Sequence, residues 1–125
     1  MIRGRLKLTG LPRDVRAAAT WALGWADYYD VPITITSGAR SWANQTRLRR
    51  NYEACLARGD FKKTPECQWP ANRPGDSAHN YGWAWDSTTS PEYQQWWNAV
   101  REMAGFDVPA NDVIHAEVPD WRSYK

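Results

Sequence analysis

The sequence predicts an α+β fold in which about three helices pack against a small antiparallel sheet. Apolar residues recur with the period of about 3.6 residues that is typical of a helix in three segments, and short alternating stretches typical of strands lie between and after them. The length of 125 residues fits one domain, because two independent cores would each be too small to be stable. We therefore expect a single domain over residues 1–125.

The three helices are predicted from apolar spacing and from residues that begin or end helices. They are expected at about 12–29, 41–59 and 90–105. In the second, Ser41 is a favourable N-cap and Gly59 a favourable C-cap. Cys55 then lies on the apolar face of this helix, and we expect it to face the core.

Strands are expected at 33–36 and at about 113–118, where apolar and polar residues alternate. Residues 77–81 and 83–86 are interpreted as two short extended segments on either side of a bend at Gly82. Between the second expected helix and these segments, residues 60–76 are rich in Lys, Pro, Asn, Gly and Asp. They predict a long surface loop, and loops of this length are uncommon unless they serve function.

Composition excludes several classes of protein. With 42% hydrophobic and 24% charged residues, the chain is neither disordered, collagen-like nor a coiled coil. No apolar run approaches the roughly 20 residues of a membrane span, so we expect no membrane insertion. The nine Trp residues are interpreted first as core material, and sugar stacking is the alternative.

Charge is unevenly distributed along the chain. Residues 1–63 carry 12 Lys and Arg against 5 Asp and Glu, a net of +7, whereas residues 64–125 carry 4 against 9, a net of -5. A basic surface could attract a polyanion such as nucleic acid or an anionic cell wall. The alternative is a solvated helix face, because three of the arginines cluster in one helical stretch: Arg47, Arg49 and Arg50.

The N-terminus and the cysteines bear on location. The first eight residues are basic but lack the apolar segment of a secretory signal, so we expect the chain to be made and kept in the cytoplasm unless it is released. Cys55 and Cys67 have no Cys-x-x-Cys spacing and form neither a disulfide framework nor a zinc knuckle. They could form a single bridge, but we expect reduced thiols.

The chain has only two histidines, and their positions suggest a metal site. His79 and Asp86 lie on either side of the bend at Gly82, so their side chains can meet, and His115 lies on the last expected strand. Imidazole and carboxylate groups bind zinc, and a catalytic zinc site uses three protein ligands. For either histidine alone, a hydrogen-bonded core position is the alternative interpretation.

Strand alternation over residues 83–86 separates large side chains from small ones. Trp83 and Trp85 share one face and are expected in the core, whereas Ala84 and Asp86 share the other. The small Ala84 would then leave space beside Asp86 for substrate and water.

Four motifs in order resemble a known family. Residues 77–86 match the pattern S-x-H-x-x-G-x-A-x-D, with Pro74-Gly75 before it. Residues 37–41, Ser-Gly-Ala-Arg-Ser, resemble an S-G-x-R-S loop, and residues 112–117 match D-x-x-H-x-E. Together they resemble the LAS-type zinc peptidases, which include D-alanyl-D-alanine carboxypeptidases and L-alanyl-D-glutamate endopeptidases and share a fold with hedgehog-like domains. The resemblance spans residues 32–118.

This resemblance implies roles for particular residues. It implies one zinc ion per chain, held by His79, Asp86 and His115. It also implies that Asp112 is the general base and that Arg40 holds the substrate carbonyl or stabilises the oxyanion. Further substrate contacts are expected from three residues: Ser37, Ser77 and Glu117.

The choice between Asp112 and Glu117 as the base depends on where the last strand begins. If alternation ran unbroken, Glu117 would share a face with His115 and Asp112 would point away. The resemblance requires Asp112 to lie in the loop before the strand, and Asn111 beside it favours a turn there. We therefore expect Asp112 to be the base and Glu117 to support the site or line its rim.

The function implied is hydrolysis of a peptide bond in the stem peptide of bacterial peptidoglycan. The segment His-Asn-Tyr-Gly and the Asp form of the last motif resemble L-alanyl-D-glutamate endopeptidases found among phage endolysins. Such a protein would be a monomer that acts on the wall after release. The alternatives are a D-alanyl-D-alanine carboxypeptidase and a non-catalytic, zinc-stabilised wall-binding or virion module. Nucleic-acid binding through the Arg47–Arg50 stretch is disfavoured.

Overall fold

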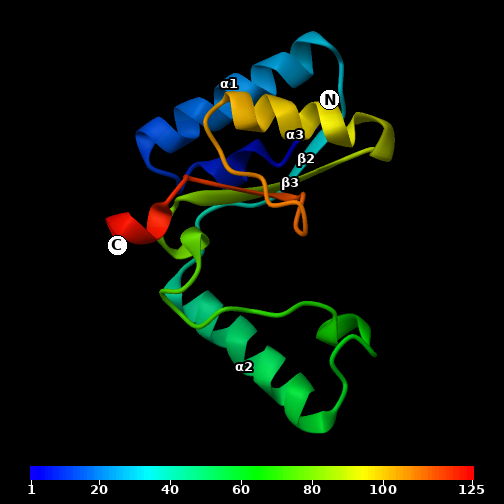
Figure 1. Ribbon diagram of the computed structural model, residues 1–125, viewed down its shortest axis with the longest axis vertical. Helices are drawn as coiled ribbons and strands as arrows, with labels where there is room; N and C mark the ends of the chain where they lie inside the picture. The colour runs from blue at the N-terminus through cyan, green and yellow to red at the C-terminus, as the bar shows by residue number, and fades with distance from the viewer.

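The computed structural model describes all residues, 1–125 (Figure 1). The α+β class is confirmed, with three α-helices, and none of them has the length and apolar character needed to cross a membrane. The strands are β1 (Ile2–Arg3), β2 (Ile33–Ser37), β3 (Ala84–Thr89) and β4 (His115–Glu117), and the helices are α1 (Arg13–Tyr28), α2 (Trp42–Arg58) and α3 (Gln94–Met103). Five short 3-10 helices are η1 (Arg5–Leu8), η2 (Pro65–Cys67), η3 (Ala78–Tyr81), η4 (Pro91–Tyr93) and η5 (Trp121–Tyr124).

The sheet is mixed rather than wholly antiparallel. Its strand order is β1-β2-β3-β4, and only the β1-β2 pair is parallel. The expectation of an antiparallel sheet is therefore wrong at this edge. The physical reason is the connection: α1 separates β1 from β2 in the chain, and a helical crossover joins parallel strands.

The pairing of β2, β3 and β4 aligns three polar residues. A bulge in β2 lets Ile35 lie opposite Ser87 while Ser37 lies opposite Asp86, which in turn pairs with His115 on β4. Bulges commonly re-aim a side chain next to a functional site. Ser37, Asp86 and His115 therefore form one row across the sheet.

One face of the sheet is covered by α1 and α3, which lie side by side (Figure 1). Trp85 is fully buried there, with its ring centroid 6.0 Å from that of Trp97 on α3 and 5.7 Å from that of Phe106. The expected core position of Trp85 is confirmed. We call the sheet with α1 and α3 the body; its buried apolar cluster contains 15 residues.

The interpretation of the tryptophans as core material holds for only part of them. Four are exposed, by 42% to 79% of their surface: Trp21, Trp25, Trp42 and Trp69. Trp21 and Trp25 lie on α1 with their ring centroids 6.1 Å apart, and Trp69 lies in the long loop.

The second helix does not pack against the sheet, which corrects our expectation for all three helices. α2 begins after Ser41, whose Oγ accepts a hydrogen bond from Asn44 N at 3.0 Å, and ends at Gly59 with φ +74°, as predicted. However, α2 and the following loop project away from the sheet on the side opposite α1 and α3 (Figure 1). The reason is its composition: the helix is largely polar and carries four arginines, so it has no broad apolar face to pack on the sheet, and only Gln45 and Cys55 are buried. We call α2 and residues 60–72 the α2 lobe.

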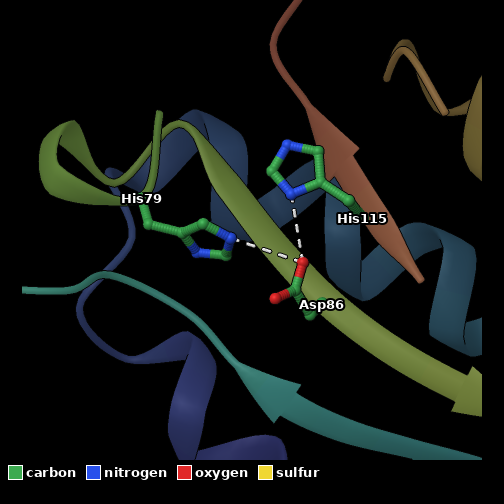
Figure 2. Close-up of side chains that lie close together, drawn as sticks. All are labelled: His79, Asp86 and His115. Atoms are coloured by element: carbon green, nitrogen blue, oxygen red, sulfur yellow. Dashed lines mark hydrogen bonds and ion pairs between the residues drawn. The ribbon is translucent and has the colours of Figure 1, made fainter. Parts of the chain in front are cut away.

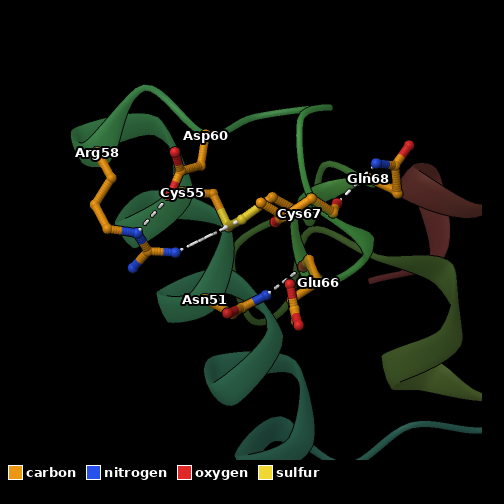
Figure 3. Close-up of a disulfide and its surroundings, with 8 residues drawn as sticks. Asn51, Cys55, Arg58, Asp60, Glu66, Cys67 and Gln68 are labelled. Atoms are coloured by element: carbon orange, nitrogen blue, oxygen red, sulfur yellow. Dashed lines mark hydrogen bonds and ion pairs between the residues drawn. A yellow bond between two sulfur atoms is a disulfide. The ribbon is translucent and has the colours of Figure 1, made fainter.

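A disulfide closes the α2 lobe (Figure 3). Cys55 near the end of α2 and Cys67 at the end of η2 have Cα atoms 5.7 Å apart, within the range of about 4.4–6.8 Å that a disulfide spans. The expectation of reduced thiols is therefore wrong. Cys55 is buried as predicted, but against Cys67 and the loop rather than in the core of the body.

The segment before Gly82 is a 3-10 turn rather than the extended segment we expected. Ser77 caps η3 through its Oγ, which accepts a hydrogen bond from His79 N at 3.3 Å. Gly82 ends the turn with φ +72°, and a Cβ at this position would lie 2.7 Å from Pro12 Cδ. This local capping outweighs the alternating pattern. The third helix and last strand are also shorter than expected, because η4 precedes α3 and a turn precedes β4.

Candidate metal site

Three side chains converge beside β3 (Figure 2). His79 Nε2 lies 3.3 Å from Asp86 Oδ1, and His115 Nδ1 lies 3.1 Å from the same oxygen. One ligand atom from each residue lies within 4.8 Å of the other two. The structure thus brings together the two histidines and the aspartate that the sequence singled out.

Each side chain is placed by a different element. Asp86 lies within β3, His115 is the first residue of β4 and its direct partner across the sheet, and His79 comes from the turn η3 (Figure 2). The two strands fix one histidine against the carboxylate. The turn then brings the second histidine over the strand, because Ala78 packs against the small Ala84.

A backbone carbonyl orients His79. Its Nδ1 donates a hydrogen bond to Gly38 O at 2.8 Å, which leaves Nε2 directed at Asp86. Gly38 approaches the chain so closely that a Cβ would lie 1.9 Å from Lys7 O, so a side chain at this position is not tolerated. A histidine that ligates a metal typically donates its other ring N–H in this way.

A carboxylate orients His115. Its Nε2 donates a hydrogen bond to Glu117 Oε1 at 2.7 Å, which leaves Nδ1 facing Asp86. Glu117 lies two residues further along β4, on the same face, as the strand alternation predicted. It does not line the cavity beside the three side chains, and instead lines a separate depression beyond His115.

The electrostatics of the group follow from burial and from these contacts. Burial of the Asp86 carboxyl raises its pKa, but hydrogen bonds from His115 and His79 outweigh that effect and hold the pKa well below its usual range. Burial lowers the pKa of His115, whereas hydrogen bonds to Asp86 and Glu117 raise it, and the net result is a raised pKa. Without an ion, the group is therefore held together by charge-assisted hydrogen bonds.

The same geometry fits a metal ion. Two zinc–ligand bonds of about 2.0–2.1 Å at the tetrahedral angle separate the ligand atoms by about 3.3 Å. The observed separations of 3.3 and 3.1 Å about Asp86 Oδ1 match this value. Two imidazole nitrogens and one carboxylate oxygen, each histidine with its other nitrogen bonded to the protein, can hold one ion.

A cavity of about 430 Å³ opens beside this group and runs along the α2 lobe. Arg40, Ser77 and Asp112 line it together with the three converging residues. From the α2 lobe it is lined by Gln45, Leu48, Asn51, Glu66, Trp69, Pro70, Ala71 and Asn72. The cavity therefore has one wall from the body and one from the α2 lobe.

Arg40 is held in the cavity by residues that the sequence did not single out for the site. Its Nη1 donates a hydrogen bond to Gln45 Oε1 at 2.9 Å, and Gln45, only 1% exposed, is anchored in turn to Asn72 O. Asn80 donates to Arg40 O at 2.9 Å and accepts from Gly75 N at 3.1 Å. A buried glutamine on the inner face of a helix, and the asparagine beside His79, are the signals that could have found them.

Burial and charge act oppositely on Arg40. Burial lowers the pKa of its guanidinium, and the negative charge of Asp86 opposes that shift, so the pKa ends below its usual value. The attraction to Asp86 places the cation in the field of the converging group. A guanidinium there can donate to an oxygen that gains negative charge.

Asp112 lies in the loop before β4, where the resemblance required it. Asp112 O accepts a hydrogen bond from His115 N at 3.0 Å, which closes a tight turn between the two residues. The Asp112 side chain is exposed and lines the cavity. Of the two acidic candidates for a base, only Asp112 therefore borders the space where a substrate can lie.

Ser37 and Ser77, which were expected to contact the substrate, form hydrogen bonds or close contacts within the protein. Ser77 caps η3, and Ser37 Oγ lies 3.4 Å from both His79 Nδ1 and Arg40 Nη2. Ser77 lines the cavity, but Ser37 does not. Ala84 does not open space beside Asp86 as expected, because it is fully buried under Ala78 and Trp121.

Known proteins share this fold, although no protein-family model and no curated protein matches the sequence. VanY, a D,D-pentapeptidase of a VanB-type vancomycin resistance cassette solved in complex with Zn(II), gives a TM-score of 0.64 at 18% identity, covering 86% of this chain and 72% of its own. LdcB, an LD-carboxypeptidase, gives 0.66 at 20% identity, covering 96% and 71%. ChiX, an L-Ala D-Glu endopeptidase of Serratia marcescens, gives 0.54 at 19% identity, covering 98% and 92%.

These similarities concern the fold. The resemblance to LAS-type zinc peptidases that the motifs predicted is confirmed at that level, since the chain shares the fold of these peptidases. The group of His79, Asp86 and His115 in this fold could bind a metal ion.

Proposed function

We propose that this protein is a zinc-dependent peptidase that cleaves a bond in the stem peptide of peptidoglycan. The observation that carries the proposal is the convergence of His79, Asp86 and His115 at one wall of a cavity that Asp112 and Arg40 also line. A metal site, a free carboxylate and a guanidinium beside one cavity are the groups that hydrolysis of a peptide bond requires.

Zinc fits the donor set best. Imidazole and carboxylate ligands in a tetrahedral arrangement, with a position left for water, are typical of catalytic zinc. When bound, the ion would polarise the substrate carbonyl and lower the pKa of a water ligand to about 7. We propose one ion per chain, held by His79 Nε2, one oxygen of Asp86 and His115 Nδ1.

The other residues act on the substrate and its protons. The Asp112 carboxylate takes a proton from the attacking water and passes it to the leaving amine. The Arg40 guanidinium, held by Gln45, donates to the carbonyl oxygen as negative charge develops there. Glu117 keeps the ring of His115 in place through the hydrogen bond at Nε2.

We further propose that the protein is an L-alanyl-D-glutamate endopeptidase. Gln45, Leu48 and Asn51 line the cavity along seven residues of α2, a rise of about 9 Å that accommodates two to three extended peptide residues. Arg40 is the only arginine or lysine of the lining, and the part formed by the α2 lobe carries Glu66 instead. A substrate that continues beyond the cleaved bond suits such a cavity, and ChiX, which shares the fold, is an endopeptidase of this specificity.

A D-alanyl-D-alanine carboxypeptidase is the second candidate. It is favoured by the fold similarity to VanY, which is higher than that to ChiX. A structure of VanY in complex with D-alanine-D-alanine also matches this chain, with a TM-score of 0.65. In that case Arg40 would bind the terminal carboxylate of the substrate rather than the oxyanion.

A matched pair of carboxylate-to-amide variants tests the proposal. Purified peptidoglycan is digested with the zinc-loaded wild type, with Asp112→Asn and with Glu117→Gln, and the fragments are identified by mass spectrometry. We expect Asp112→Asn to lose activity by about 100-fold or more while it keeps one zinc ion per chain. We expect Glu117→Gln to bind zinc about 10- to 100-fold more weakly but to be active at saturating zinc.

The fragments and the variants distinguish the candidates. New amino groups on D-glutamate support the endopeptidase, whereas free D-alanine alone would establish the carboxypeptidase. Full activity of Asp112→Asn, with loss of activity in Glu117→Gln at saturating zinc, would show that Glu117 rather than Asp112 is the general base. A wild type that binds zinc but releases no fragment would be a non-catalytic module.

A further inference from the structure

The body contains a buried arginine that takes no part in the cavity. Arg101 on α3 is 0% exposed and forms no ion pair with an acidic residue. Arginine is almost never fully buried without a paired charge, because removing its charge from water is unfavourable. Something in the fold must therefore use its five N–H donors.

The hydrogen bonds of Arg101 show where these donors go. Within α3 the guanidinium donates to Asn98 Oδ1 at 2.7 Å, and its Nε donates to Trp97 O at 3.4 Å. Outside α3 it donates to two carbonyl oxygens only: Nη2 to Val113 O at 2.6 Å and Nη1 to Ile114 O at 3.2 Å. Both belong to the turn between Asp112 and His115.

That turn has few other attachments. His115 N donates to Asp112 O at 3.0 Å, and Ile114 O also accepts a hydrogen bond from Ser87 N of β3 at 2.9 Å. The Asp112 side chain itself is exposed, with no hydrogen bond to another protein group. The position of Asp112 therefore depends on the backbone of the turn that carries it.

We propose that Arg101 is a positioning residue that fixes the turn at residues 112–115, and thereby sets the Asp112 carboxylate and the His115 ring relative to each other. Its planar fork reaches two successive carbonyls at once, which a lysine ammonium cannot do with the same rigidity. The role for Asp112 rests on the proposed function. The fixing of the turn does not.

The charge of Arg101 is retained in the buried position. Burial lowers the pKa of its guanidinium to about 10, and the negative charges of Asp86 and Glu102 oppose that shift. The side chain is therefore protonated near neutral pH and keeps all its donors. Its positive charge also lies within reach of Asp86, the central carboxylate of the candidate metal site.

Three variants test this role. Arg101→Met keeps most of the buried volume but removes every donor, so the carbonyl oxygens of Val113 and Ile114 lose their partner and we expect a lower melting temperature. Arg101→Lys keeps the charge and part of the donor set. Val100→Ala is the control, because it loosens the core at the neighbouring buried position of α3 but removes no hydrogen bond to the turn.

Two readouts are needed, and one does not depend on activity. Amide hydrogen exchange at His115, whose N–H closes the turn, is measured in all variants together with exchange in α1 and with the melting temperature. kcat, KM and zinc content are then measured with a peptidoglycan fragment, at a temperature where every variant is folded.

For Arg101→Met we expect faster exchange at His115, unchanged exchange in α1, and a kcat lowered about 10- to 100-fold with KM changed less than about threefold. Arg101→Lys should recover part of kcat, and Val100→Ala should lower the melting temperature without lowering kcat. Unchanged exchange at His115 in Arg101→Met, or in Arg101→Lys if the former does not fold, would overturn the proposal. Faster exchange with unchanged kcat would also overturn it, since Arg101 would then support only the fold.

A failure of the proposed function gives a different result. If the wild type neither binds zinc nor cleaves peptidoglycan, the proposed function is wrong, and exchange at His115 still decides whether Arg101 fixes the turn. If the wild type is active, the variants decide the role of Arg101 in positioning Asp112.

Discussion

The body and the α2 lobe form opposite walls of one cavity but are built in different ways. The body has a continuous apolar core between the sheet and the helices α1 and α3. The α2 lobe has a single disulfide, between Cys55 and Cys67, and three hydrogen bonds from side chains of α2 to backbone carbonyls of its loop. These bonds are Asn51 to Glu66 O, Gln45 to Asn72 O and Arg49 to Ala71 O.

The difference assigns separate tasks to the two regions. All three candidate metal ligands and Asp112 come from elements of the body or from segments packed directly on it. The α2 lobe supplies the other wall of the cavity and the glutamine that holds Arg40. In the proposed function the reacting groups therefore belong to the body with its apolar core, whereas the surface proposed to contact the rest of a substrate belongs to the crosslinked α2 lobe.

Removal of the central carboxylate should have the largest effect. Asp86→Asn keeps the shape of the side chain but cannot supply an anionic ligand, so we expect zinc content to fall from about one ion per chain to near zero and activity to fall by about 1,000-fold or more. Inductively coupled plasma mass spectrometry and a wall-lysis assay measure these quantities. Because the α2 lobe takes no part in binding the ion, amide exchange in α2 should be unchanged. Faster exchange there would contradict the assignment of metal binding to the body alone.

The pH dependence of metal binding should be the next largest effect. The raised pKa of His115 means that without metal its protonated form stabilises the fold below about pH 6.5, and this stabilisation is lost as pH rises through the folded pKa. The lowered pKa of Asp86 contributes stability above about pH 3.9, which is lost as pH falls. We therefore expect the metal-free protein to be most stable between about pH 4 and 6.5.

Zinc should reverse this trend in the upper part of the range. An ion must displace the proton of His115, so zinc affinity should rise about tenfold per pH unit for each proton displaced until His115 is deprotonated. The shift in melting temperature on adding zinc, measured from pH 5 to 8, tests this sign. Glu117→Gln removes one cause of the raised pKa of His115, so the rise in zinc affinity should occur at lower pH in this variant. A zinc-induced shift in melting temperature that does not depend on pH would contradict the role of His115 as a ligand.

Opening the disulfide should have a smaller effect, confined to the α2 lobe. A crosslink over 12 residues contributes about 3 kcal/mol by restricting the unfolded chain. In the double variant Cys55→Ser and Cys67→Ser we expect faster amide exchange in α2 but not in β3, unchanged zinc content, and a KM raised about three- to tenfold. Leu56→Ala, an exposed neighbour on the same helix, is the control. An unchanged KM would show that the α2 lobe does not contact the substrate.

The parts of the fold that depend on local signals could be predicted from the sequence. The ends of α2 follow from Ser41 and Gly59, whose capping needs no distant partner. The group of His79, Asp86 and His115 could be predicted because a motif and a scarcity of histidine left few alternatives. Its arrangement in space still required the pairing of β3 with β4.

Other parts depend on where distant segments meet, and local pattern does not encode that. The disulfide requires the loop to return to α2, and the positions of Cys55 and Cys67 along the chain do not reveal this path. Gln45 and Arg101 look like ordinary helix residues, and their buried hydrogen bonds appear only once the loop and the turn before β4 are in place. Periodicity also shows that α2 has an inner face without showing that the face meets a loop rather than the sheet.

The row of Ser37, Asp86 and His115 across β2, β3 and β4 has a consequence for folding. Successive residues of a strand point to opposite faces, so a slip of one residue in either pairing would move a member of the row away from the others. A chain that has collapsed with its strands misaligned would lack the site, however much helix it contained. During refolding, the capacity to bind an ion should therefore appear when the strands reach their native alignment, and a metal-sensitive probe would report this step separately from helix formation.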